Sequence, residues 1–306
     1  MMTTGTKTCV SSAPDMPAAG SSSLPGAILL LSKPAIVLAE TAAGLTGMLL
    51  ASRGQPPSAI IVCWCLLSLI MAASGAAMAN CALEADTDRK MARLTDRNRA
   101  LAIVGRTRVL TIALSLLGGA FLVTGIYLNL LTLLLLTAAC ISYLLLYTLA
   151  MKRRSPWSVL AGAVPGALPP LIGAAAVSGG VSALTLLLGF VIVIWQFPHF
   201  WFLALQYSDQ YRQAGIPVLP LTHGIKLTKR LTLLSSAALL PATLAFSLLG
   251  PVSPGFISAV LLTGMLFPLF CHYFLYRTGD YRKGFMLSLA YLATILVALI
   301  ADISLR

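Results

Sequence analysis

Scarce acidic residues gather in one short stretch, residues 80–97, which reads NCALEADTDRKMARLTDR. The chain holds only nine Asp and Glu in 306 residues, and three of them, Glu84, Asp86 and Asp88, fall within five positions. Asn80, Glu84 and Asp88 are spaced i, i+4 and i+8, so on a helix they form one stripe. Asp86 points to another side of that helix, and it reaches the stripe only if the end of the helix unwinds.

This stripe predicts a metal and phosphate site. Stacked carboxylates at the C-terminal end of a helix repel one another and meet the negative end of the helix dipole, so a bound cation relieves them. Carboxylate and amide oxygens suit Mg²⁺, which keeps positions free for substrate phosphates. Arg93 and Arg97 follow one and two turns later, and guanidinium groups grip phosphate oxygens in pairs. The alternative is a solvated loop with internal salt bridges. The metal ligands and their support are predicted to be Asn80, Glu84, Asp88 and Asp86.

A second polar segment, residues 199–230, has a similar layout. Gln206 and Gln210 repeat the i, i+4 spacing with Asp209 beside them, and four cations follow. Two such loops on one side of a membrane could close over a diphosphate whose apolar tail lies among the helices, which describes a prenyl donor. Dry apolar walls would protect an allylic carbocation, and aromatic faces would stabilise it. The aromatic candidates, which an interfacial aromatic belt explains equally well, are Tyr143, Tyr147, Trp195, Phe197 and Trp201.

The elements that must position these residues are transmembrane helices. The chain is 58% hydrophobic and 10% charged, and soluble domains carry about 25% charged residues. Hydrocarbon cannot satisfy an open backbone, so the apolar runs must be helical, and the sequence predicts an all-α polytopic bundle. Nine spans are predicted at residues 27–51, 58–82, 109–128, 131–150, 158–178, 182–205, 231–249, 254–275 and 284–303.

The distribution of basic residues predicts the orientation of these spans. Loops 83–108, 151–157, 206–230 and 276–283 all fall on one side and carry 17 of the 21 Lys and Arg. The positive-inside rule places that side, and the N-terminus, in the cytoplasm and the C-terminus in the periplasm or outside. The net charge of +12 therefore reflects membrane topology, and it does not indicate nucleic acid. The two long loops lie four spans apart, which favours two four-helix units plus a ninth span.

The domain organisation predicted from the composition is simple. Residues 1–24 are rich in Ser, Ala, Thr and Pro, which predicts a disordered cytoplasmic N-terminus ahead of one transmembrane domain, residues 25–306. That N-terminal stretch has one Lys, no Arg and an Asp, which is atypical of a mitochondrial transit peptide. A bacterial inner membrane is the expected location.

At this point the chain resembles the UbiA superfamily of intramembrane prenyltransferases, and within it the branch that farnesylates haem. The first acidic motif of that family, Asn-x-x-x-Asp-x-Asp-x-Asp-x-x-Met-x-Arg-x-x-x-Arg, is matched with Glu84 as the one departure. The matching residues are Asn80, Glu84, Asp86, Asp88, Met91, Arg93 and Arg97. Further similar segments are SKP at 32–34, KRRSPW at 152–157, PGALPPLIG at 165–173, PHFW at 198–201, AGIPVLP at 214–220 and FMLSLAYL at 285–292.

The resemblance implies the UbiA-type helical arrangement and Mg²⁺-dependent transfer of farnesyl from farnesyl diphosphate to a vinyl group of haem b, with addition of water, forming haem O. It implies contact with diphosphate or haem propionates by a set of polar residues. These are Arg93, Arg97, Lys152, Arg153, Arg154, His199, Asp209, Gln210 and Tyr211. His199 is equally consistent with a structural bond to a neighbouring helix. Contact with haem A synthase or oxidase assembly factors is a further expectation.

The second acidic motif of the superfamily is reduced here. The haem branch generally keeps an Asp just before the Tyr, whereas this chain has Gln210 before Tyr211 and its only acid one position earlier, at Asp209. Two alternatives stay open. One is prenyl transfer to an aromatic or quinone precursor, which would favour a complete second motif. The other is a transporter, which would need charged groups in mid-span, where Glu40 is the candidate.

Overall fold

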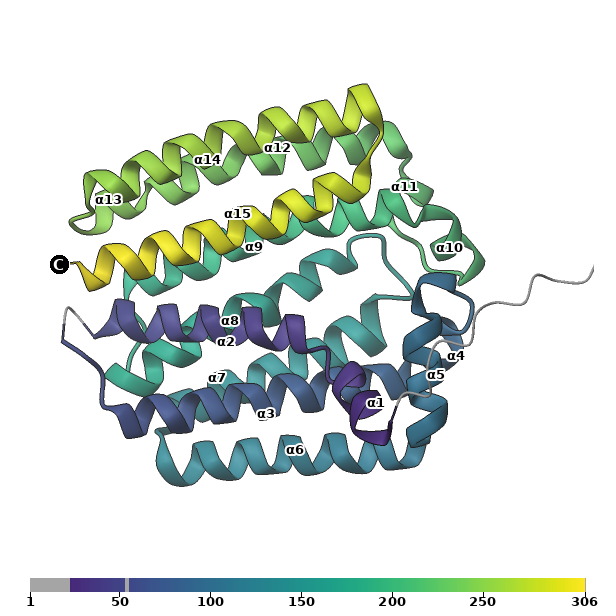
Figure 1. The fold of residues 1–306 in the computed structure, drawn as a ribbon, viewed down its shortest axis with the longest axis horizontal. Coiled ribbons are helices and arrows are strands. Elements are labelled where there is room, and N and C mark those ends of the chain that lie inside the picture. Colours follow the sequence, from purple (N-terminus) through teal and green to yellow (C-terminus); the bar gives the residue numbers. More distant parts are fainter. Residues whose placement is uncertain (1–22, 53–54, 306) are drawn as a thin grey trace, which may run out of the picture.

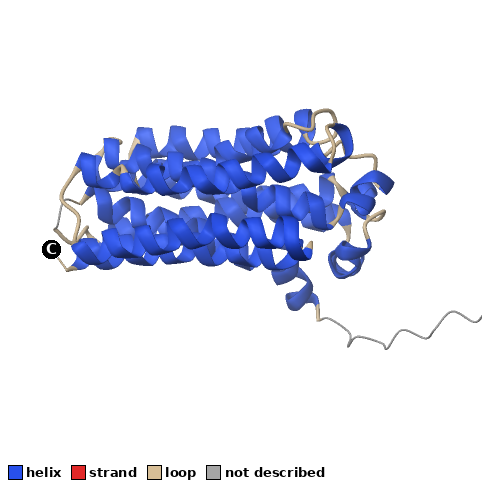
Figure 2. Ribbon diagram, turned by 90° about the horizontal axis from the view of Figure 1, so that it is seen from above, coloured by secondary structure: helices blue, strands red, loops and turns tan. Residues whose placement is uncertain are grey.

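The computed structural model describes residues 23–52 and 55–305, and within these ranges it contains nine helices long and apolar enough to span a membrane. They form one bundle of roughly aligned helices (Figures 1 and 2), which confirms the predicted all-α fold. The spans are α2 (Pro34–Ala51), α3 (Ala59–Leu83), α6 (Arg106–Tyr127), α7 with η2 (Leu130–Ile141 and Ser142–Met151), α8 (Ser158–Ser178), α9 (Ala183–Gln206), α12 with α13 (Ile225–Leu244 and Phe246–Leu249), α14 with η3 (Pro254–His272 and Tyr273–Thr278) and α15 (Tyr281–Ser304). The predicted disordered segment was residues 1–24, of which residues 1–22 lie outside the described part of the chain, while Leu24 begins helix α1.

The first predicted span, residues 27–51, is divided in the structure. A separate helix α1 (Leu24–Leu31) precedes α2, and Lys33 between them has a left-handed backbone with φ 54°. Pro34 causes the break, because its ring disfavours a right-handed helical conformation in the preceding residue. Helix α1 therefore turns away from the axis of α2 and packs against α5 (Thr95–Val104) and α3 (Figure 1). A left-handed Lys costs about 1–3 kcal/mol and persists only where its surroundings impose it.

Five short helices lie together at one end of the bundle, and the C-terminus lies at the other end (Figure 1). They are α4 (Ala85–Asp88), η1 (Ala92–Leu94), α5, α10 (Ser208–Gln213) and α11 (Leu219–Thr222). Met91, which is 2% exposed, packs with Tyr211, Ala214 and Ile216 and so joins the loop after α3 to the loop after α9. The two polar segments identified in the sequence therefore meet, although more than a hundred residues separate them.

The fourth and eighth spans both finish in a π-helix at that same end, η2 and η3. In η2 the Lys152 N–H donates to the Tyr147 carbonyl at 2.9 Å, and the Thr148 hydroxyl donates to the Tyr143 carbonyl, also at 2.9 Å. A π-turn is wider than an α-turn and occurs frequently at functional sites. Here the wider turn sets the direction of Thr148 and Lys152.

Close packing of α2 on α8 fixes the inward face of the first span. A Cβ atom at Gly47 would collide with the backbone of Pro170, and one at Gly173 would collide with the backbone of Gly44. Small residues allow transmembrane helices to approach this closely. The face of α2 that carries Gly44 and Gly47 is therefore held against the interior of the bundle.

Candidate active site

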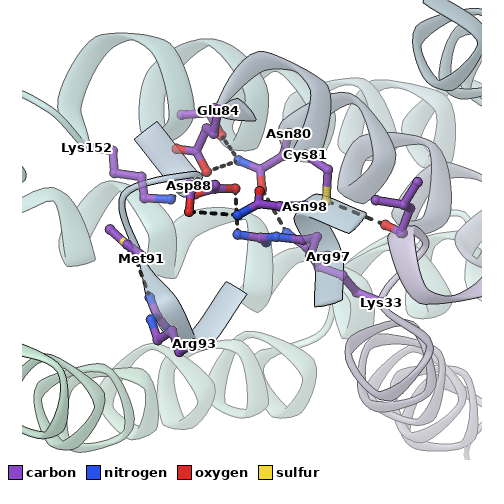
Figure 3. A network of polar contacts seen from close by, with 12 residues as sticks. Lys33, Asn80, Cys81, Glu84, Asp88, Met91, Arg93, Arg97, Asn98 and Lys152 are labelled. Carbon is purple, nitrogen blue, oxygen red and sulfur yellow. Dashed lines mark hydrogen bonds and ion pairs between the residues drawn. The ribbon is translucent and has the colours of Figure 1, made fainter. Parts of the chain in front are cut away.

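Asn80 and Glu84 form the centre of the polar group at the end of α3. Both are buried, 2% and 3% exposed. The Asn80 amide donates to Glu84 Oε2 at 2.8 Å, and Lys152 Nζ donates to the same oxygen at 2.6 Å (Figure 3). The Asn80 amide also donates to the Thr148 hydroxyl at 3.1 Å. Thr148 lies in the π-helix η2 and Lys152 follows it directly. Their hydrogen bonds therefore hold the end of the second span against the fourth.

Asp88 continues the stripe beyond a break in the helix. Helix α3 ends at Leu83, yet the Asp88 N–H still bonds the Glu84 carbonyl at 2.9 Å, so the i, i+4 geometry persists across the junction. The Arg97 guanidinium donates to Asp88 Oδ2 at 2.6 Å (Figure 3). Burial raises the pKa of the Asp88 carboxyl, and the charge of Arg97 opposes part of that rise. Helix α5 carries Arg97 back onto Asp88, after the chain has turned at Met91.

Lys33 also belongs to this group, although the sequence analysis did not assign it to the site. Its ammonium donates to Asn80 Oδ1 at 2.8 Å and lies 3.5 Å from the Tyr143 hydroxyl. The left-handed turn before Pro34 directs the side chain inward. Burial lowers the pKa of Lys33 to about 8. The signal for this role in the sequence was the SKP segment at 32–34. A proline after the lysine restricts the lysine backbone and so limits where its side chain can point.

Together these residues make up what we call the charged cluster: Lys33, Asn80, Glu84, Asp88, Arg97 and Lys152. Its three cations face two carboxylates, so the cluster has a surplus of one positive charge. No group of three or more His, Cys, Asp or Glu that could hold a metal occurs within the described ranges. Two carboxylates and an amide oxygen are nevertheless hard donors of the kind that Mg²⁺ takes, usually through one or two carboxylates, so the donor set fits that ion.

Arg93 leaves the stripe and contacts the second polar loop. Its guanidinium donates to the Tyr211 hydroxyl at 2.8 Å and lies 4.8 Å from the ring centroid of Tyr207. Its backbone N–H donates to Gln210 Oε1 at 3.1 Å. The predicted contribution of the second loop is therefore partly present, since Gln210 and Tyr211 hold Arg93. Tyr207 was not expected, and its spacing of four residues from Tyr211 was the available signal.

The structure does not bring two of the predicted acidic residues to the charged cluster. Asp86 has a side chain that is 69% exposed and lies 3.6 Å from both Arg89 and Arg106. Asp209 is 78% exposed at the side chain and pairs with Arg212 at 3.0 Å. The helix does break at Glu84, but Asp86 in α4 still faces outward, toward Arg89 and Arg106. In this conformation Asp86 and Asp209 are surface ion pairs.

Three predicted substrate-binding residues also lie outside the charged cluster. Arg153 and Arg154 are exposed just after η2. His199 Nδ1 lies 2.8 Å from the Ser288 hydroxyl on α15, and its ring stacks on Trp195 and Phe285 at centroid distances of 4.6 and 4.4 Å. The structural alternative for His199, a bond to a neighbouring helix, is thus present in the fold.

Comparison with known proteins identifies the family of the chain. The model of the UbiA prenyltransferase family matches residues 41–299. The chain is 42% identical over 259 residues to a protoheme IX farnesyltransferase of Geotalea uraniireducens. The aligned region covers 85% of this chain and 100% of the relative. A solved digeranylgeranylglyceryl phosphate synthase has a TM-score of 0.75 at 13% identity, over 92% of this chain and 99% of the other. A UbiA homologue from Archaeoglobus fulgidus, bound to DMAPP and Mg²⁺, has a TM-score of 0.64 at 13% identity, over 89% and 99%. This chain thus belongs to the UbiA prenyltransferase family.

Proposed function

We propose that this chain transfers a farnesyl group from farnesyl diphosphate to a vinyl group of haem b, with addition of water, forming haem O. The proposal rests on two buried N–H donors of arginine side chains. Nε of Arg93 and Nε of Arg97 are buried and have no hydrogen-bond partner in the described part of the chain. Buried N–H groups are rarely left unpaired. Arg97 belongs to the charged cluster, which has surplus positive charge, and Arg93 lies four residues before it in the chain. An anionic ligand with several oxygens supplies what they lack.

The diphosphate of the donor is the ligand that this chemistry favours. Lys33 and Lys152 already stand on opposite sides of the Asn80–Glu84 pair, with Arg97 below Asp88. Charged donors make short and strong hydrogen bonds to phosphate oxygens. Cations that now hold carboxylates would share their N–H groups with the diphosphate, so its negative charge would offset the surplus in the charged cluster.

We assign the Mg²⁺ to Glu84 and Asp88, with Asn80 as the third oxygen donor. When bound, the ion would neutralise charge that builds up on the departing diphosphate. The chain's own residues prepare that position, because Asn80 orients Glu84 through its amide and Arg97 orients Asp88. The solved A. fulgidus homologue holds Mg²⁺ together with DMAPP, which supports a divalent ion in this role.

The acceptor would lie below the charged cluster, among the apolar helices. Tyr143 and Tyr147 project from η2 beneath it with their ring centroids 5.9 Å apart. Aromatic faces attract a nearby cation, and a dry site protects it from unwanted water. The exposed Arg153 and Arg154 at the membrane edge suit the two propionates of haem b, which prefer the interface. The relative from Geotalea uraniireducens bears the name protoheme IX farnesyltransferase, which supports haem as the acceptor.

The test is incubation of the purified protein with haem b, Mg²⁺ and farnesyl diphosphate, followed by mass analysis of the haem. We expect a haem heavier by one farnesyl group and one water, and loss of product when a chelator removes the metal. Unmodified haem under conditions in which a control enzyme is active would refute the proposal.

We further propose that the charged cluster faces the cytoplasm of a bacterial cell, with the C-terminus on the opposite side. The support is the concentration of Lys and Arg in the loops at that end. Labelling of single cysteines placed at residues 90 and 252 in intact cells tests it. Only the second position should react with a membrane-impermeant reagent. The division into a disordered segment, residues 1–24, and one domain, residues 25–306, and contact with haem A synthase or assembly factors, stay predictions.

A further inference from the structure

Glu40 is an acidic residue inside a membrane span that the chemistry described so far does not use. It lies in α2, on the same helical face as Val37, Gly44 and Gly47, three or four residues from its neighbours on that face. Those neighbours are buried, and Gly44 and Gly47 are the residues that contact α8. The Glu40 carboxylate is therefore on the inward side of the first span. Leu38, on the lipid side, is 70% exposed.

Glu40 lies deeper in the membrane span than the charged cluster and interacts with one of its members. It is seven residues after Lys33, which places it about 10 Å deeper along a helix that rises about 1.5 Å per residue. Its carboxylate interacts electrostatically with Lys33, and with Tyr143 and Cys140 on the fourth span. The Tyr143 hydroxyl also lies 3.5 Å from the Lys33 ammonium, so Tyr143 interacts with both Lys33 and Glu40.

No hydrogen bond or ion pair of the Glu40 side chain occurs within the described part of the chain. A carboxyl group in a membrane interior is costly, and it usually marks a substrate or proton path. A structural Glu would be expected to bond an adjacent helix, as Asn80 does with Thr148. Glu40 instead interacts electrostatically with Tyr143, a tyrosine of the proposed acceptor site.

We propose that Glu40 is the catalytic base that receives the proton of the water added to the acceptor. This inference rests on the proposed function, because only an acceptor that gains water needs such a base. Burial disfavours the ionised carboxylate at this depth, and the positive charge of Lys33 offsets part of that cost. A base at a dry site contributes to the rate because no bulk water is present there to accept the proton.

The reaction balances as follows. The bond between C1 of farnesyl and the diphosphate oxygen breaks, and its electron pair leaves with the diphosphate. The vinyl group supplies the electron pair for a new bond from its terminal carbon to C1, which leaves a cation on the inner vinyl carbon. Water adds to that carbon through oxygen, and the Glu40 carboxylate takes one of its protons to leave a hydroxyl group. Without a base for water, the cation loses a proton from the adjacent carbon to the released diphosphate, and the product is one water lighter.

The experiment compares wild type, Glu40→Gln and Glu40→Asp in detergent with haem b, Mg²⁺ and farnesyl diphosphate. Two quantities are measured: diphosphate released and the ratio of hydrated to dehydrated farnesyl-haem by mass. Removal of a general base typically costs about 100-fold or more, so Glu40→Gln should lower the hydrated product by about that factor while the dehydrated product grows. Glu40→Asp keeps a carboxylate and should restore part of the ratio. Asp96→Asn is the matched control, because Asp96 is an exposed acid paired with Arg99.

The outcomes separate the two proposals. A changed product ratio in Glu40→Gln, with normal ratios in Asp96→Asn, supports the base. A lower overall rate with an unchanged ratio means that Glu40 has only a structural role and overturns this inference alone. Wild-type protein that releases diphosphate but leaves the haem unmodified overturns the haem function, and the base with it.

Discussion

Replacing Lys152 by Met should destabilise the protein measurably, because it leaves a buried carboxylate without its counter-charge. Lys152 Nζ lies 2.6 Å from Glu84 Oε2, and the side chains are 18% and 3% exposed. Methionine keeps the length of the apolar stem and removes only the ammonium. Glu84 would then retain one neutral partner, the Asn80 amide. A buried charge that loses its counter-charge is strongly unfavourable.

The size of the effect follows from the distance. At an effective dielectric constant of about 20, unit charges 2.6 Å apart attract by about 6 kcal/mol. The variant also avoids the desolvation cost of the ammonium, which amounts to several kcal/mol. A net loss of about 3 kcal/mol remains, at the lower end of the range for breaking a buried pair from one side. Chains of this size shift by about 2 °C per kcal/mol, so the Tm should fall by about 6 °C.

Thermal unfolding in detergent measures this change. Arg153→Met is the matched control, because it removes a positive charge one residue away at an exposed position. It should alter the Tm by about 1 °C or less, as surface substitutions do. Adding Glu84→Gln to Lys152→Met removes the stranded charge and should restore most of the Tm. Equal losses for Lys152→Met and Arg153→Met, or no recovery in the double variant, would refute the ion-pair reasoning.

Three further predictions address the other parts of the site. Lys33→Gly keeps the left-handed turn and removes the ammonium, so prenyl transfer should fall by about 10-fold or more while the Tm stays within about 2 °C; a large Tm loss would contradict the assignment to binding. Arg93→Lys loses the flat guanidinium between Tyr207 and Tyr211, so the KM for farnesyl diphosphate should rise about 10-fold, and an unchanged KM would count against it. Asp209→Asn removes an exposed surface ion pair worth about 0–1 kcal/mol, so turnover should stay near wild type. A loss of turnover above about 10-fold would show that Asp209 takes part in the site.

The membrane bundle could be predicted from the sequence because its signals are local. A run of about 20 apolar residues has to form a helix in hydrocarbon, and the structure has nine such helices in its described ranges. The stripe of Asn80, Glu84 and Asp88 is also local, because it depends only on helical periodicity. The break after Leu31 was missed because the apolar character continues through it, and only the backbone restriction before Pro34 divides the helix there.

The composition of the site beyond that stripe depended on the tertiary structure. Lys33 meets Asn80 from 47 residues away, Lys152 meets Glu84 from 68, and Arg93 meets Tyr211 from 118. Asp86 shares the acidic motif in sequence yet points to Arg106, because helix geometry turns alternate residues to different sides. The sequence by itself determined the helices and the stripe of oxygen donors along one of them. Packing alone decided which cations reach those donors, since a side chain's partners are set by the helices that close around it.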